Sequence, residues 1–154
     1  MTSDLEAILA AHPFFYGMEP EHVATLASVA TPARFDVGKQ IIKQGEEANA
    51  CFLVLEGDAA LEIVIPGKGP QVIQTLHAGD ILGWSWLFAP YEWSFDAQAL
   101  TPIRAIRFDA PELREAKAAD AALKADLMER FAEVLVMRLQ AARLQLMDLY
   151  GNPR

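Results

Sequence analysis

The chain has 154 residues, a hydrophobic fraction of 53% and a mean hydropathy of +0.14, which favour one folded domain and exclude a disordered chain. Its formal net charge is −8 and it has no basic run, which argues against direct nucleic-acid binding. The single cysteine, Cys51, excludes an internal disulfide. No apolar run reaches the roughly 20 residues that cross a bilayer, and the acidic N-terminus lacks a signal-peptide start, so we expect a cytoplasmic location.

The first 30 residues predict two short helices. Residues 5–11 place their apolar side chains on one helical face, and Pro13 ends this segment. A second helix opens at Glu19-Pro20-Glu21, because proline suits the first helical turn and acidic side chains suit the positive end of the helix dipole. We expect Pro32 to close this part of the chain.

From Thr31 to Phe108 short apolar runs alternate with glycines, which predicts an antiparallel β-roll or barrel. Five runs are predicted as strands: residues 39–43, 51–55, 59–65, 71–76 and 103–108. Residues 66–70, with the sequence Pro-Gly-Lys-Gly-Pro, predict a hairpin turn between two of these strands.

The chain after Phe108 predicts two further helices. Asp109-Ala110-Pro111-Glu112 is typical of a helix start, and this short helix extends to about Lys117. Asp120 opens a long helix that runs to about Tyr150. Its roughly 30 residues span about 45 Å, which is longer than a domain of this size needs for its own core.

The long helix carries two apolar seams. One steps by alternate threes and fours, as in a coiled coil, through Met128, Ala132, Leu135, Leu139, Ala142, Leu146 and Leu149. The other consists of Leu123, Leu127, Phe131 and Val134. The shorter seam can pack on the roll while the longer one meets another helix, so we expect a homodimer through this helix. The alternative is that both seams are intramolecular.

Glycines mark the corners of the predicted roll. They lie in four segments: Phe35-Asp36-Val37-Gly38-Lys39, Lys43-Gln44-Gly45-Glu46, Phe52-Leu53-Val54-Leu55-Glu56-Gly57 and Leu76-His77-Ala78-Gly79-Asp80-Ile81-Leu82-Gly83. Their order and spacing resemble the cyclic nucleotide-binding domain of the catabolite-activator (Crp/Fnr) superfamily. The resemblance implies a mainly β fold, an antiparallel β-roll of jelly-roll type with flanking helices. We expect a single domain over 1–154, with N-terminal helices at 1–30, the roll at 31–108, C-terminal helices at 109–150 and no helix-turn-helix domain.

The resemblance places a phosphate-binding cassette directly after Leu82-Gly83, where the N–H groups of a helix N-terminus face the cyclic phosphate. It implies a ribose-binding Glu right after the glycine and a phosphate-pairing Arg about ten residues on. This sequence has Trp84 at the first position and Trp93, followed by Ser94, at the second, although a shift of one residue puts Glu92 there.

No Lys or Arg occurs between Gln71 and Pro102, so a phosphate buried in this cassette would lack its counter-charge. Loss of one partner of a buried charge pair costs about 3–5 kcal/mol, which corresponds to a loss of about two to four orders of magnitude in affinity. We therefore predict that cAMP and cGMP do not bind in the usual way. An anion held only by backbone N–H groups is the alternative.

All three tryptophans lie between residues 84 and 93, within what we call the aromatic cassette (residues 83–94). Its candidate ligand-binding residues are Gly83, Trp84, Ser85, Trp86, Leu87, Trp93 and Ser94. One interpretation is a pocket for an uncharged, flat or apolar small molecule, with indole walls and serine guides. A second is a self-filled core in which the indoles occupy the vacated nucleotide space. A third is an exposed patch for a partner protein.

The sequence shows no catalytic constellation. We expect His12, His22 and His77 to be isolated histidines on surfaces or at helix ends, because they do not sit at metal spacing, and we predict no metal and no cofactor. A cupin-like enzyme would need a metal cluster of His with a carboxylate. The expected function is a non-catalytic regulatory or sensor module that acts as a dimer or through a partner, without nucleic-acid or membrane binding. The alternative is the ligand-binding part of a Crp/Fnr-type regulator cut short before its DNA-binding domain.

Overall fold

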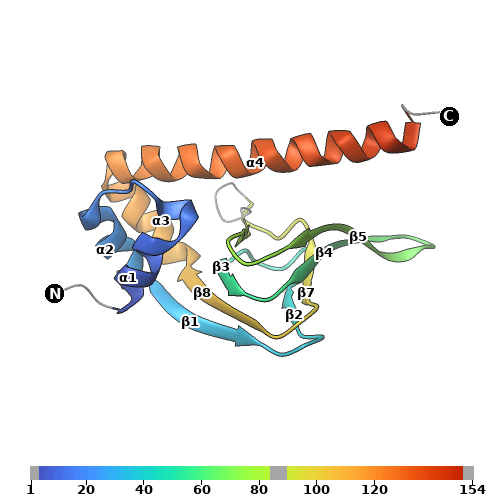
Figure 1. Ribbon diagram of the computed structural model, residues 1–154, viewed down its shortest axis with the longest axis horizontal. Helices are drawn as coiled ribbons and strands as arrows, with labels where there is room; N and C mark the ends of the chain where they lie inside the picture. Colours follow the sequence, from blue (N-terminus) through green and yellow to red (C-terminus); the bar gives the residue numbers. More distant parts are fainter. Residues whose placement is uncertain (1–3, 84–89, 151–154) are drawn as a thin grey trace. The chain divides into compact units, whose positions relative to one another are not determined.

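The computed structural model describes residues 4–83 and 90–150 (Figure 1). The chain forms two compact units, Met1–Ala119 and Asp120–Arg154. The first unit contains the N-terminal helices, the described β-strands and the helix α3, and the second contains the long helix α4.

Three helical segments begin the first unit: α1 (Asp4–Ala11), the 3-10 helix η1 (Pro13–Phe15) and α2 (Pro20–Ser28). Both predicted helices are thereby confirmed. Their inward faces bury Leu9 of α1 together with Val23 and Leu26 of α2. Pro20 occupies the first turn of α2, where its missing N–H group costs no helical hydrogen bond.

The roll consists of two four-stranded antiparallel sheets (Figure 1). The strands of the first, in spatial order, are β1 (Ala30–Phe35), β8 (Ile103–Asp109), β3 (Ala50–Glu56) and β6 (Ile81–Leu82). Those of the second are β2 (Gln40–Ile42), β7 (Asp96–Ala99), β4 (Ala59–Ile65) and β5 (Gly69–Leu76). This arrangement confirms the predicted jelly-roll type of fold.

The core of the roll is built mainly from β3, β4 and β8. Residues 50–54 of β3 are all buried, because this strand lies inside its sheet between β8 and β6. Leu53 is opposite Ile106 of β8 and Ile81 of β6, and all three side chains are buried. The continuous apolar run in β3 therefore reflects a central strand.

Strand β1 corrects the prediction that Pro32 closes the helical part. Pro32 lies within β1, opposite Ile106 in a ladder that runs from Ala30↔Phe108 to Phe35↔Ile103. Because β1 is at the edge of its sheet, the missing N–H of proline need not remove a ladder hydrogen bond. The sequence also does not predict β6 and β7. These strands have two and four residues, which is too short for an alternation of apolar and polar side chains to be recognised.

The predicted hairpin turn joins β4 and β5. The N–H of Lys68 donates to the carbonyl of Ile65 at 2.9 Å. Gly67 and Gly69 both have positive φ angles, of 83° and 77°. Glycine adopts such angles without steric cost, which explains its place at both positions.

The C-terminal helices begin where the sequence predicts. Asp109 precedes α3 (Ala110–Ala119), and its Oδ1 accepts from the N–H of Glu112 at 2.9 Å. Asp120 precedes α4 (Ala121–Tyr150), and its Oδ1 accepts from the N–H groups of Ala122 and Leu123 at 3.0 and 3.1 Å. No helix in the described ranges has an apolar stretch long enough to cross a membrane.

The two predicted seams of α4 differ in exposure. In the shorter seam Leu123, Leu127 and Phe131 are buried. In the predicted dimer seam the exposed fractions are 62% at Leu139 and 56% at Leu146. Its other described members are half-buried at Met128 and Leu135 and exposed at Ala132 and Ala142, and the side chain of Leu149 lies outside the described residues.

Candidate functional site

The aromatic cassette begins where β6 ends. Leu82 of β6 is opposite Phe52 of β3, so the glycine that follows is anchored to the core of the roll. Gly83 is buried and has a φ of +100°. Four of the predicted site residues, Trp84, Ser85, Trp86 and Leu87, lie outside the described residues.

The second half of the cassette pairs with the segment that follows β2. The N–H of Trp93 donates to the carbonyl of Glu46, and the carbonyl of Trp93 accepts from the N–H of Gly45, each at 2.9 Å. The N–H of Ala48 donates to the carbonyl of Tyr91 at 2.6 Å. These main-chain bonds hold residues 91–93 antiparallel to residues 45–48, just before β7 begins.

This pairing fixes Trp93 with its indole against Gly83. Only 6% of Trp93 is exposed. A Cβ atom added to Gly83 would lie 2.8 Å from both Cη2 and Cζ3 of the indole, closer than side-chain carbons approach one another. The structure therefore brings together Gly83 and Trp93 of the predicted site, while Ser94 and the neighbouring Glu92 are exposed.

Arg114 is a residue at this site that the sequence analysis missed. It lies on α3, and its Cζ is 4.2 Å from the centroid of the Tyr91 ring, which is a cation–π contact. Buried Leu113 and the bond from the N–H of Ala110 to the carbonyl of Asn49 hold α3 in place. No local sequence signal predicts this contact, because it depends on tertiary packing between segments distant in the chain.

Tyr91 has an unusual backbone conformation. Its φ of 59° lies in the left-handed region, which costs a non-glycine residue energy. The bond from Ala48 to its carbonyl and the stacked Arg114 both hold this conformation. Strained backbone often occurs at functional sites. The surrounding fold therefore holds Tyr91, at this end of the cassette, in an unfavourable backbone conformation.

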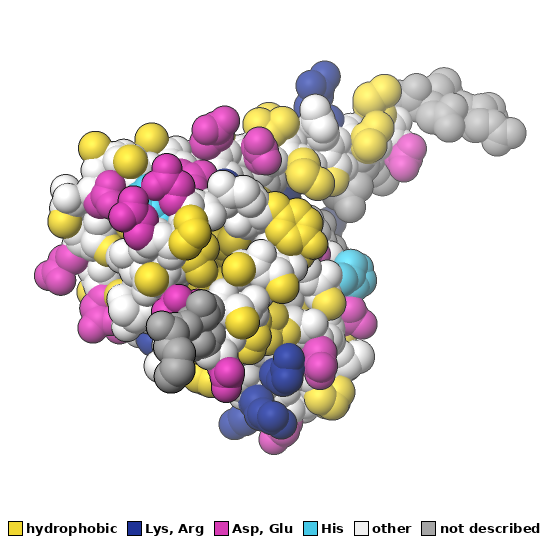
Figure 2. All heavy atoms as spheres, turned by 60° about the vertical axis from the view of Figure 1, so that its left-hand side comes forward, with side chains coloured by type: hydrophobic (Ala, Val, Ile, Leu, Met, Phe, Trp, Pro, Cys, Tyr) yellow, Lys and Arg dark blue, Asp and Glu magenta, His cyan; other side chains and the backbone are white. Residues whose placement is uncertain are grey.

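Acidic side chains lie on the turn before β6 and in the second half of the cassette, at Asp80 and Glu92. Figure 2 shows acidic side chains scattered among hydrophobic ones on the visible face, with a close group of them beside a histidine. His77, on the turn before β6, and Asp58, between β3 and β4, form an exposed pair with Nδ1 and Oδ1 2.6 Å apart. The carboxylate of Asp80 accepts from the N–H of His77 at 2.8 Å, which shapes the same turn.

Two of the three histidines are buried rather than at the surface, but both lie at helix ends, as expected: His12 is the N-cap of η1 and His22 lies in the first turn of α2. The exposed fractions are 7% for His12 and 5% for His22. Burial lowers the pKa of the His12 imidazole from its ordinary value, and a hydrogen bond of the imidazole to the backbone of Val54 and the charge of Asp80 oppose this effect. His12 also caps η1, since its Nδ1 accepts from the N–H of Phe14 at 3.2 Å.

Comparison with known proteins places this fold in a family. Residues 32–120 match the family model of the cyclic nucleotide-binding domain. Since that match covers more than half of the chain, the protein belongs to the cyclic nucleotide-binding domain family. The resemblance to Crp-type domains is thereby confirmed.

Individual relatives agree with this assignment. The chain is 26% identical over 145 residues to a CRP-like cAMP-activated global transcriptional regulator of Mycobacterium tuberculosis, covering 94% of this chain and 63% of the relative. It is similar in structure to a putative cyclic nucleotide-binding protein from Geobacter metallireducens, with a TM-score of 0.79, 26% identity and coverage of 89% and 98%. The catabolite activator protein of Thermus thermophilus has a TM-score of 0.68, 26% identity and coverage of 89% and 62%.

Proposed function

We propose that this chain is a non-catalytic regulatory module whose ancestral nucleotide site is closed, so that it binds neither cAMP nor cGMP in the way typical of its family. The contact of Trp93 with Gly83 carries this proposal. The resemblance assigns the phosphate-pairing Arg to the position of Trp93, and here that position holds a buried indole. An indole supplies no positive charge and fills space beside the glycine that opens the cassette.

Electrostatics supports the same proposal. The sequence has no Lys or Arg between Gln71 and Pro102, and the residue beside Trp93 that a shifted alignment would use is the exposed carboxylate Glu92. A buried phosphate without its cation loses about 3–5 kcal/mol. The expected affinity is therefore about two to four orders of magnitude below that of a site with the arginine.

A second candidate function is the binding of a different anion, and Arg114 is the observation in its favour. Its guanidinium lies over the Tyr91 ring, within the second half of the cassette. The planar face of arginine can stack on an aromatic ring while its edge donates hydrogen bonds to an anion. This alternative predicts phosphate binding that Arg114→Gln abolishes and Arg114→Lys weakens.

Two other occupants are compatible with an aromatic cassette. One is an uncharged, flat or apolar small molecule, and the other is a partner protein. The burial of Trp93 favours the self-filled interpretation for this one indole.

We further propose that the module is a homodimer through α4. The exposed leucines of the dimer seam, Leu139 and Leu146, support this proposal, because water-exposed leucines at coiled-coil spacing gain stability when a second helix covers them. A ligand or partner at the cassette would then act by shifting the C-terminal helices.

The alternative is that this chain is the ligand-binding part of a longer Crp/Fnr-type regulator. The chain spans 63% of the length of the Mycobacterium tuberculosis regulator that it matches, which supports this alternative. The length of the native reading frame distinguishes the two proposals.

Intrinsic fluorescence tests the closed site, since all three tryptophans lie in the cassette. We expect Trp93→Phe to remove a blue-shifted component of the emission, because the Trp93 indole is buried. We also expect cAMP and cGMP to leave the wild-type emission unchanged at micromolar concentration. A saturable quench by either nucleotide, lost in Trp93→Phe, would overturn the proposal. Quenching by phosphate alone that requires Arg114 would favour the second candidate function.

A further inference from the structure

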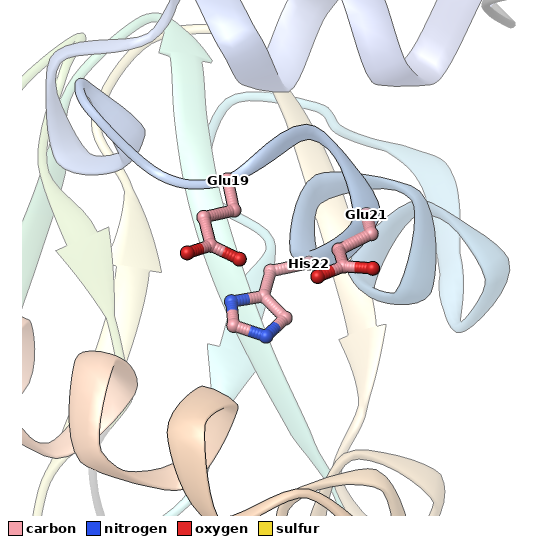
Figure 3. A group of neighbouring side chains, drawn as sticks. All are labelled: Glu19, Glu21 and His22. Atoms are coloured by element: carbon pink, nitrogen blue, oxygen red, sulfur yellow. The ribbon is translucent and has the colours of Figure 1, made fainter.

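We infer that Glu19, Glu21 and His22 form a binding site for a divalent transition-metal ion at the start of α2. One ligand atom from each residue, a ring nitrogen or a carboxylate oxygen, lies within 4.8 Å of the others. Figure 3 shows the Glu19 carboxylate turned toward a ring nitrogen of His22, with the Glu21 carboxylate beside the ring. This site is separate from the aromatic cassette and does not depend on the proposed function.

The imidazole of His22 is the fixed member of the group. Only 5% of His22 is exposed, whereas both carboxylates are exposed. Its backbone N–H donates to the carbonyl of Glu19 at 3.0 Å, and the next residue, Val23, is buried in the core. An incoming ion would therefore meet a pre-positioned nitrogen ligand and need to order only two surface side chains, which lowers the entropic cost of binding.

The two carboxylates are not used elsewhere by the described structure. Glu19 is the N-cap of α2, yet its side chain makes no capping hydrogen bond. No lysine or arginine in the described ranges forms an ion pair with Glu19 or Glu21. Two neighbouring negative charges without a cation repel each other, and a divalent ion placed between them removes that repulsion.

The ligand set indicates the class of ion. One imidazole with two carboxylates suits zinc, manganese, iron, cobalt or nickel, whereas calcium and magnesium prefer all-oxygen sites. Three protein ligands leave the remaining coordination positions of the ion to water. Because both carboxylates are exposed, the bound ion would lie at the protein surface. The positive end of the α2 dipole opposes a cation. Pro20 weakens this opposition because it contributes no N–H to the first turn.

Competition of the full chain with a fluorescent chelator for Zn²⁺ and Ni²⁺ tests this inference. We expect one ion per chain in the wild type, and at least about a tenfold loss of affinity in His22→Gln and in the double variant Glu19→Gln/Glu21→Gln. Because His22 is buried, circular dichroism must show that His22→Gln is still folded. The double variant tests the same site through two exposed side chains, whose replacement should leave the fold intact.

Two matched controls separate this site from general metal binding. His77→Gln removes the exposed imidazole that pairs with Asp58, and Glu46→Gln/Glu47→Gln removes two exposed carboxylates elsewhere. We expect both controls to bind the ions with wild-type affinity. Absence of binding in the wild type, unchanged binding in Glu19→Gln/Glu21→Gln, or loss of binding in His77→Gln would each overturn the inference.

Discussion

The indole of Trp93 lies against the backbone of Gly83, so that a Cβ on the glycine would be 2.8 Å from two ring carbons. The glycine opens the cassette that the cyclic nucleotide-binding family uses for phosphate, and the tryptophan stands at the position to which the resemblance assigns the phosphate-pairing arginine. The two residues thus pack together where the resemblance leads one to expect a phosphate site.

Gly83→Ala should destabilise the protein more than Gly79→Ala does. Both glycines have similar positive φ angles, +100° and +97°, so both variants carry similar backbone strain. Only the new methyl group at position 83 meets the indole, because a Cβ at Gly79 has nothing within 4 Å. We expect the overpacking to add about 1–3 kcal/mol to the loss in free energy of unfolding, measured by urea denaturation.

Trp93→Leu supplies the control for that comparison. In its background the additional cost of Gly83→Ala over Gly79→Ala should shrink, since the smaller side chain leaves room for the methyl group. If both alanine variants lost the same free energy of unfolding in the wild-type background, the Trp93 indole would move aside easily and would not close the site.

The free energy of unfolding should fall as the pH drops below about 6.5, the ordinary pKa of histidine, in part because of His12. Burial lowers the pKa of His12 in the folded state. The unfolded chain therefore takes up this proton first, and the contribution of His12 to stability is complete above the unfolded pKa and lost as the pH falls toward the folded one. Protonation also removes the Nδ1 acceptor of the Phe14 N–H.

His12→Asn tests this prediction, because asparagine keeps an acceptor for the Phe14 N–H but does not titrate. Urea denaturation at a series of pH values should show a shallower loss of stability for His12→Asn than for the wild type below about pH 6.5. Parallel curves for wild type and His12→Asn would contradict the assigned role of burial.

Leu139→Glu/Leu146→Glu should dissociate the proposed homodimer. Both leucines belong to the dimer seam and are exposed in the single chain. Like charges facing each other across a helix pair cost several kcal/mol, so the dissociation constant should rise by more than about tenfold. Leu144→Glu is the matched control, because Leu144 is equally exposed at 62% but lies outside the seam. A monomeric wild type in sedimentation velocity at high concentration would refute the dimer.

Much of the fold could be predicted from the sequence where local chemistry decides it. The capping residues Asp109 and Asp120 and the glycines of the 66–70 turn act within a few residues, and the structure confirms each of them. Strand β1 could not be predicted in this way. Its Pro32 is tolerated only because β1 is an edge strand, and edge position is a property of the complete sheet.

The sequence indicates which residue types form the candidate site, but it does not indicate the contacts between them. The sequence indicates a cassette without its cation, and it locates Gly83 and Trp93. It does not indicate that Arg114 reaches Tyr91 from α3, since only tertiary packing joins them. The group around His22 was missed for another reason. The three histidines show no metal spacing among themselves, whereas the neighbours of His22 in the structure are the carboxylates Glu19 and Glu21.

Isothermal titration calorimetry of the purified full chain with cAMP and cGMP measures directly whether the nucleotide site is closed. We expect no saturable binding of either nucleotide at micromolar concentration, because the packed Trp93 supplies no counter-charge for the phosphate. The same chain should show a cooperative urea transition, which establishes that the sample is folded. Saturable binding of either nucleotide with a micromolar or tighter dissociation constant would contradict the closed site.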